Sequence, residues 1–290
     1  MKRVQWVPLV VVALLILLGG GATAWWSGVR QNHTRVFWDM VSNNLSTTGV
    51  TRTTLQSSGQ LSILQYTQTH FVEHPTAHAL TQFKTGKNTL ATEEISDKKQ
   101  DLVRYQKITI VDKASVDLSP VLGKWARLKD GQTVQGQLTS GLFSQSLLDI
   151  LPIGNLQPTD RRQLVALMRS QDMFQLDDAT FKKATIKGRE EYLYSVKIKP
   201  DVYVLVMQRF ESLIGATAYK SLHASNYAKG DPIAVVISVD ARSHTLAQLY
   251  EVAPQKAVVY QGFGALASDP VPRASITTTQ LTSRLAQLQQ

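Results

Sequence analysis

The side chains in this chain best placed to do chemistry are three histidines and a glutamate between positions 70 and 78. His70, His74 and His78 are spaced by four, which on a helix would place three imidazoles on one face, where they could bind a divalent transition metal. Pro75 would interrupt such a helix, and the residues before it have the composition of a strand. Glu73 directly precedes its histidine, so the His-Glu-x-x-His motif is not formed. We therefore expect polar residues at a hairpin end, with a metal site as the weaker alternative.

Two other familiar catalytic templates are missing from the sequence, a Gly-x-Ser-x-Gly elbow and a glycine-rich phosphate loop. The adjacent acids at 93–94, 177–178 and 190–191 would point to opposite faces of a strand, which suits surface charge better than paired acid–base catalysis. The cysteine count is 0, which excludes thiol catalysis, thiolate metal sites, disulfides and an acylated cysteine anchor. We expect no enzymatic activity and no cofactor.

The charge of the chain also limits its partners. The formal net charge is +9, but lysines and arginines occur singly or as doublets, not as a basic stripe with interleaved aromatic residues. We therefore expect a solvated basic surface and no nucleic-acid binding. Attraction to anionic lipid headgroups or to acidic wall polymers is the alternative, because it needs only net charge.

The N-terminal segment has the composition of a membrane span. No charged side chain occurs from Val4 to Val29, and Lys2 and Arg3 precede this run. Trp6 and the tryptophan pair at 25–26 stand at its two ends, about 29 Å apart on a helix, close to the thickness of a bilayer's hydrocarbon core. Tryptophan favours the headgroup level, and basic residues favour the cytoplasmic side. These features predict a single membrane span.

The span sets the expected domain organisation and location. We expect an anchor or signal segment at 1–30, an extracytoplasmic β-rich domain at 31–270, and a tail with a short helix at 271–290. The expected location is the cell membrane. Ala22, Thr23 and Ala24 form a small-x-small pattern of the kind that signal peptidase cleaves, so secretion after cleavage near Ala24 is the alternative.

Behind the span, the period of apolar residues predicts an α+β domain. Strands are expected at 61–71, 79–83, 90–95, 102–110, 124–128, 181–186, 192–198 and 258–263, and a hairpin at 233–240 and 245–252. Helices are expected at 32–44, 144–151, 160–169, 202–215 and 277–288. We predict that the helices near 160–169 and 202–215 pack across one face of a twisted antiparallel sheet.

This order of elements resembles the LolA/LppX-like group of envelope proteins, of the LppX/LprG type. The closest local likeness runs from Ile150 to Gly154, through Ile186 to Val196, to the hairpin around Val239. The resemblance implies a curved antiparallel sheet forming a half-barrel, with helices on its concave face above a lipid-sized cavity. It also implies a lipid, or the acyl part of a lipoprotein, as ligand.

If such a cavity exists, its wall should come from the apolar faces of the helices. The residues that fall on those faces are Leu147, Leu151, Leu164, Leu167, Met168, Val206, Phe210 and Leu213. Their other interpretation is a plain hydrophobic core, because cavity-lining and core-filling faces have the same composition. The sequence therefore leaves two functions open: an apolar-ligand-binding protein, or an anchored structural or interaction domain with a filled core. It does not indicate the oligomeric state.

Overall fold

The computed structural model of the chain describes most of the domain behind the N-terminal segment. The described residues are 32–73, 75–97, 100–110, 117–128, 133–134, 138–139, 142–147, 149–216, 219–251, 256–264, 271–274 and 276–287. The predicted span at 4–29 lies outside them. Among the helices within these ranges, none has the length and apolar character needed to cross a bilayer.

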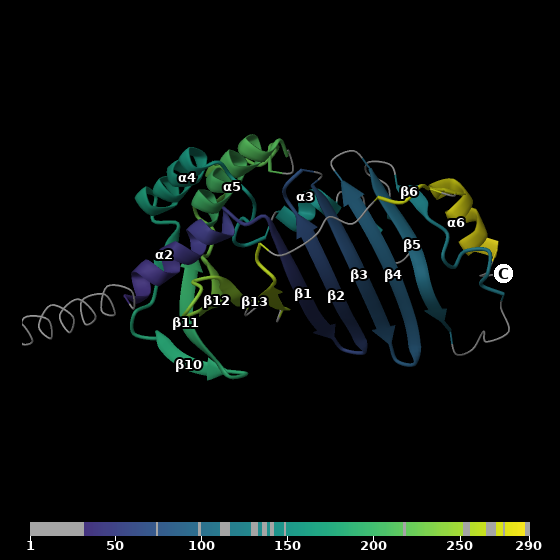
Figure 1. The fold of residues 1–290 in the computed structure, drawn as a ribbon, viewed down its shortest axis with the longest axis horizontal. Helices are drawn as coiled ribbons and strands as arrows, with labels where there is room; N and C mark the ends of the chain where they lie inside the picture. The colour runs from purple at the N-terminus through teal and green to yellow at the C-terminus, as the bar shows by residue number, and fades with distance from the viewer. Residues whose placement is uncertain are drawn as a thin grey trace, which may run out of the picture.

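One large antiparallel sheet organises the domain (Figure 1). Its order is β10 (Lys182–Ile186), β11 (Arg189–Ile198), β12 (Ile233–Asp240), β13 (Leu246–Glu251), β14 (Lys256–Gln261), β1 (Gly49–Ser58), β2 (Leu61–His70), β3 (Thr76–Thr85), β4 (Asn88–Asp97), β5 (Asp101–Thr109), β6 (Ala126–Leu128) and β15 (Ile276–Thr277). β9 (Phe174–Leu176) pairs with β11 on the same edge as β10, opposite β12, and among the described strands only β15 runs parallel to its neighbour, β6. The two end strands do not pair with each other in this order, so the sheet is curved but unclosed.

The strands from the two halves of the sequence belong to the same sheet. β14 pairs with β1, which joins the strands formed late in the sequence to those formed early. A short hairpin of β7 (Thr133–Val134) and β8 (Leu138–Thr139) lies outside the main sheet. The single continuous ladder means that the alternation of side chains can be followed from β10 to β5, which defines two faces.

The helices cover one of these faces. α2 (His33–Asn44), α4 (Pro158–Ser170) and α5 (Pro200–Ile214) bury side chains in the same cluster as Tyr194, Ile237 and Val258. α3 (Leu142–Leu147) joins this cluster beside Ala77 and Ala79, and the Phe143 N–H donates to Ser96 Oγ at 3.1 Å. We call this side the helix face, and the opposite side the outer face. The prediction that both amphipathic helices pack on one face of a twisted antiparallel sheet is confirmed.

Local signals in the sequence explain where these helices begin and end. The Asn32 side chain accepts a hydrogen bond from the Arg35 N–H and caps α2. Pro158 and Pro200 start α4 and α5, where a missing N–H costs nothing. Gly215 ends α5 in the left-handed conformation with φ +76°, which glycine adopts without strain.

The C-terminal segment is bound to the domain. β15 pairs with β6, and α6 (Thr278–Gln287) buries Leu281 in a second cluster with Val103, Tyr105 and Leu128. This cluster closes the β5–β6 end of the sheet. The predicted terminal helix at 277–288 is present, and it packs against the sheet edge.

Most predicted strands match the structure, including the hairpin of β12 and β13. The prediction missed β1 and four strands of two or three residues, β7, β8, β9 and β15. β1 is rich in threonine, serine and glutamine, and the polar composition of 49–58 hid its alternation. The helix expected at 144–151 is α3, which occupies 142–147.

Candidate functional site

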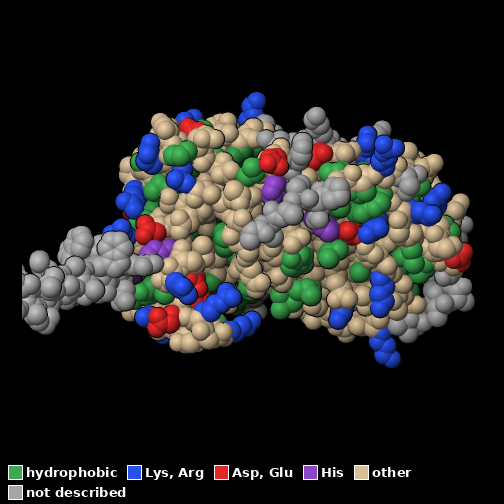
Figure 2. Space-filling view, in the orientation of Figure 1, with side chains coloured by type: hydrophobic (Ala, Val, Ile, Leu, Met, Phe, Trp, Pro, Cys, Tyr) green, Lys and Arg blue, Asp and Glu red, His purple; other side chains and the backbone are tan. Residues whose placement is uncertain are grey.

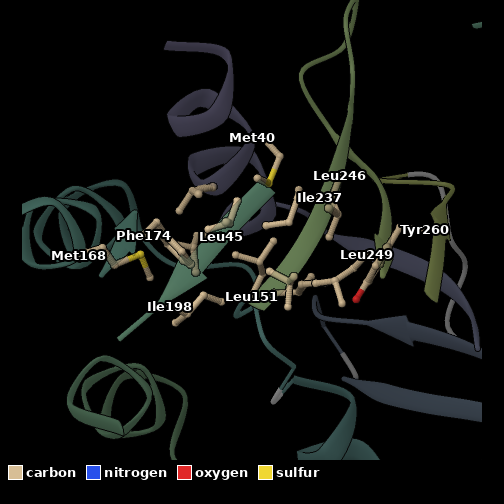
Figure 3. Packing of buried hydrophobic residues seen from close by; sticks show 14 of the residues in the cluster. Met40, Leu45, Leu151, Met168, Phe174, Ile198, Ile237, Leu246, Leu249 and Tyr260 are labelled. Atoms are coloured by element: carbon tan, nitrogen blue, oxygen red, sulfur yellow. The ribbon is translucent and has the colours of Figure 1, made fainter. Parts of the chain in front are cut away.

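The residues predicted to line a ligand cavity lie mainly in the packed interior. Five of them are almost wholly buried in the cluster between the helices and the sheet: Leu151, Leu164, Met168, Val206 and Phe210. Figure 3 shows Leu151 and Met168 among the other side chains of this cluster. Leu167 and Leu213 are partly buried against the same cluster, and the Leu147 side chain lies outside the described residues. The structure thus brings together seven of the eight, but as neighbours in a core.

The packing around Phe210 shows how closely this interior is filled. A Cβ atom added at Gly154 would lie 3.3 Å from Phe210 Cζ, closer than most ordinary contacts. We describe three cavities in this structure. Of the seven predicted residues whose side chains are described, six line none of the three, and the seventh, Leu213, lines one of these cavities. This cavity, about 260 Å³, lies beside Phe143 and Leu156 at the end of α5. A ligand wall made of helix faces stays a prediction.

A buried polar network ties the segment after α3 to the sheet. Asp149 Oδ2 accepts hydrogen bonds from Tyr260 Oη at 2.6 Å and from Arg52 Nη1 at 3.0 Å, and Asp149 Oδ1 accepts from the Ile150 N–H at 2.8 Å. Burial alone would raise the pKa of Asp149, but the positive charges of Arg52 and Lys256 and the Tyr260 hydrogen bond outweigh it and hold the pKa below its ordinary value. Burial and the Asp149 charge raise the pKa of Tyr260.

Tyr203 extends this network to α5. Its hydroxyl donates to the Asp149 carbonyl oxygen at 3.2 Å and lies 2.9 Å from the Tyr219 hydroxyl. Burial, followed by the hydrogen bond to Tyr219, raises the pKa of Tyr203. The polar groups of the network are directed at one another, so its evident role is to fix the 149–151 segment against β1, β14 and α5. Sequence reasoning missed it, because its members are far apart in the chain and only the fold brings them together.

The structure describes two of the three histidines proposed as metal ligands, and these two lie on adjacent strands. His70 lies on β2, His78 lies on β3, and His74 is outside the described residues. His78 Nε2 lies 2.9 Å from Glu93 Oε1, and Glu93 also accepts from Arg104 and Gln106. Within the described ranges, no group of three or more His, Cys, Asp or Glu side chains is arranged to hold a metal ion.

An apolar pocket opens on the helix face at the hairpin end of β2–β5. We call it the β2–β5 pocket; its volume is about 340 Å³, within the range of about 300–1,000 Å³ typical of small-molecule sites. The side chains that line it are Leu61, Phe83, Thr85, Asn88, Thr89, Leu90, Ile108, Thr109 and Ile110. Its lining is dominated by large aliphatic and aromatic groups and holds no charged side chain.

Strand register builds this pocket. Phe83 on β3 pairs with Leu90 on β4, and Leu90 pairs with Ile108 on β5, so the three side chains stand in one row. Leu90 and Ser96 are six residues apart on one strand and so point to the same face, and Ser96 holds α3. The sequence signal was three predicted strands with alternating apolar residues. The register that aligns them could not be read from composition.

A larger cleft, about 610 Å³, lies at the ends of β11–β14 and has a different chemistry. Its lining includes Lys187, Arg189, Glu191 and Asp240 together with several amide and hydroxyl side chains. Glu191 is buried and accepts a hydrogen bond from Ser238 Oγ. An alkyl chain bound in this cleft would remove water from these charged side chains without replacing their hydrogen bonds, which costs free energy. The β2–β5 pocket has no charged side chain and is therefore the better site for an apolar ligand.

The fold and this pocket define a class: an α+β domain with a large, curved, unclosed antiparallel sheet, helices on one face, and an apolar pocket on that face. Among solved structures, the chain resembles LprF from Mycobacterium bovis, with 10% sequence identity and a TM-score of 0.40. The match covers 82% of this chain and 95% of that chain. It agrees at fold level with the LppX/LprG-type resemblance and assigns no role to any residue. No protein-family model and no curated protein sequence matches this chain.

Proposed function

We propose that this protein is a non-catalytic, membrane-anchored extracytoplasmic protein that binds a lipid or another apolar ligand. The observation that carries the proposal is the β2–β5 pocket, whose lining offers a row of aliphatic and aromatic side chains and no charge. The uncharged run from Val4 to Val29 supports the anchor.

The energetics of such a site require no polar motif. Each methylene removed from water contributes about 0.8 kcal/mol, so an alkyl chain gains affinity from burial alone. Ile110 is 43% exposed at the edge of the pocket, so a ligand could cover apolar surface that water now contacts. An acyl chain is therefore the ligand chemistry that this lining fits best.

A photoreactive fatty acid is the direct probe. The full-length protein, reconstituted in nanodiscs, would be irradiated with the probe and digested, and the modified peptides would be mapped by mass spectrometry. We expect modification of the peptides that contain Phe83–Leu90 and Ile108–Ile110. Modification confined to α4 and α5 would instead support the cavity wall predicted from the helix faces.

Two variants with a matched control test the same site. Leu90→Trp and Ile110→Trp should fill the pocket and reduce labelling; displacing about four methylenes costs about 3 kcal/mol, more than a hundredfold in affinity. Leu205→Trp is the control, because Leu205 lies exposed on α5 and is not part of the pocket lining. Cooperative unfolding of each variant would show that its fold is intact. Equal labelling of all three variants would overturn the proposal.

The second candidate function is an anchored structural or interaction domain without an apolar ligand. The densely filled cluster between helices and sheet favours it, since the side chains there already bury one another. Failure of the probe to label any peptide, together with no co-purifying lipid in the mass spectrum, would make this second function the better account.

A further inference from the structure

The outer face of the sheet carries an exposed apolar stripe. Its members are Leu55, Leu64, Tyr66, Leu80 and Tyr250, which are 50%, 43%, 37%, 42% and 41% exposed. Most exposed apolar side chains occur singly and need no explanation, whereas a contiguous group marks an interaction surface.

Strand register shows that these side chains are contiguous. Leu55 pairs directly with Leu64, and Tyr66, two residues further along β2, pairs with Leu80. Ala257 pairs with both Leu55 and Tyr250 and bridges the stripe across β14. The stripe therefore occupies two adjacent cross-strand rows from β13 to β3, on the side away from α2, α3, α4 and α5. Figure 2 shows apolar side chains gathered over β1–β3 with lysine and arginine beside them.

The exposed charges that flank the stripe are positive. Exposed lysines of the outer face flank it on both sides: Lys84 and Lys107 on β3 and β5, and Lys182 and Lys197 on β10 and β11. Glu93, the acid that shares these rows, is buried and is held by Arg104 and His78. The stripe thus presents apolar groups framed by exposed cations.

Apolar side chains flanked by lysines indicate which kind of partner the outer face binds. A second copy of the chain would bring the same lysines against one another, which opposes self-association. An anionic lipid surface offers negative headgroups to the lysines and an apolar boundary to the leucines and tyrosines. We propose that the outer face docks on an anionic membrane surface through the apolar stripe and its flanking lysines.

The predicted anchor would hold the domain close to a membrane surface. The inference therefore rests on the membrane anchor of the proposed function. The uncharged run ends at Val29 and α2 begins at His33, so three residues join them. Three extended residues span at most about 11 Å, which keeps the domain beside the bilayer and raises the local concentration of lipid at the stripe.

Because the chain contains no cysteine, a single introduced thiol gives a unique labelling site. The full-length Leu64→Cys variant would carry an environment-sensitive fluorophore in nanodiscs of phosphatidylcholine with phosphatidylglycerol as the minor lipid, or of phosphatidylcholine alone. The matched control is Leu205→Cys on α5, where the native residue is 41% exposed, close to the 43% of Leu64. Headgroup spin-labelled lipid serves as the quencher.

We expect strong quenching and a blue shift at position 64 in the anionic nanodiscs, and little at position 205. Raising the salt from about 0.15 M to about 1 M shortens the Debye length from about 8 Å to about 3 Å and should weaken docking. The double change Lys84→Glu and Lys107→Glu should weaken it at least about 25-fold, at about fivefold for each lysine removed.

Equal quenching at both positions, or no quenching at position 64, would overturn the docking surface. The same holds if quenching at 64 is unchanged by the double lysine variant. These results are distinguishable from a failure of the proposed function. Loss of the anchor would appear as a truncated mass, and loss of the ligand site as absent acyl labelling of the β2–β5 pocket.

Discussion

Glu94 on β4 should make the stability of the domain fall with rising pH, and Glu94→Gln should remove this effect. Glu94 is 7% exposed, and its Oε1 atom has no hydrogen-bond partner within the described part of the chain. Burial raises the pKa of Glu94 to about 8 from an ordinary value of 4.5, and the negative charge of Asp101 on β5 adds to the rise. The folded protein therefore holds Glu94 protonated at neutral pH.

The sign and size follow from proton linkage. As pH rises above about 4.5, the unfolded chain releases the Glu94 proton while the folded chain keeps it, so the free energy of unfolding declines until about pH 8 and then levels off. One pH unit corresponds to about 1.36 kcal/mol, which makes the full loss about 5 kcal/mol. Glutamine cannot ionise, so we expect Glu94→Gln to be more stable than the natural chain by about 2–5 kcal/mol near pH 9.

Urea unfolding followed by tryptophan fluorescence, at about pH 5, 7 and 9, measures this difference. Glu190→Gln is the control, because Glu190 is exposed on β11 and its removal should leave the pH dependence unchanged. Asp101→Asn should reduce the decline in part, since it removes the second cause of the pKa rise. Parallel pH profiles for the natural chain and Glu94→Gln would refute the reasoning.

Three further expected outcomes concern the core, the buried network and the anchor. Phe210→Ala should cost about 3–5 kcal/mol of unfolding free energy in urea titrations, because it empties a filled interior; a cost below about 1 kcal/mol would show that the interior can collapse. Asp149→Asn should cost about 3–5 kcal/mol at neutral pH by leaving the Arg52 charge buried without its partner. The pKa of folded Asp149 lies below its ordinary value of 3.8, so the cost should shrink as pH falls below 3.8, where the unfolded chain takes up a proton that folded Asp149 does not; a cost independent of pH would contradict the ion pair. The native protein should fractionate with membranes at full mass, whereas a mature N-terminus at Trp25 would show cleavage.

The sequence alone determined much of the element list. Period-two and period-3.6 patterns located β12, β13, α4 and α5, because these segments bury one face and must therefore alternate. Pro200 and Gly215 marked the ends of α5 through backbone restrictions that act locally. The absence of cysteine, of a nucleophile elbow and of a glycine-rich phosphate loop favoured a function based on apolar burial over a catalytic one.

The tertiary structure decided which apolar residues face a cavity. Leu164 and Phe210 fall on helix faces that either fill a core or line a ligand site, and only the packing placed them in a filled interior. The register between strands decided that Leu90 and Ile108 line a pocket on the helix face. It also decided that Leu64 and Leu80 belong to an exposed stripe on the outer face. A shift of one residue would exchange the faces of a strand, and register depends on contacts between strands that no local pattern contains.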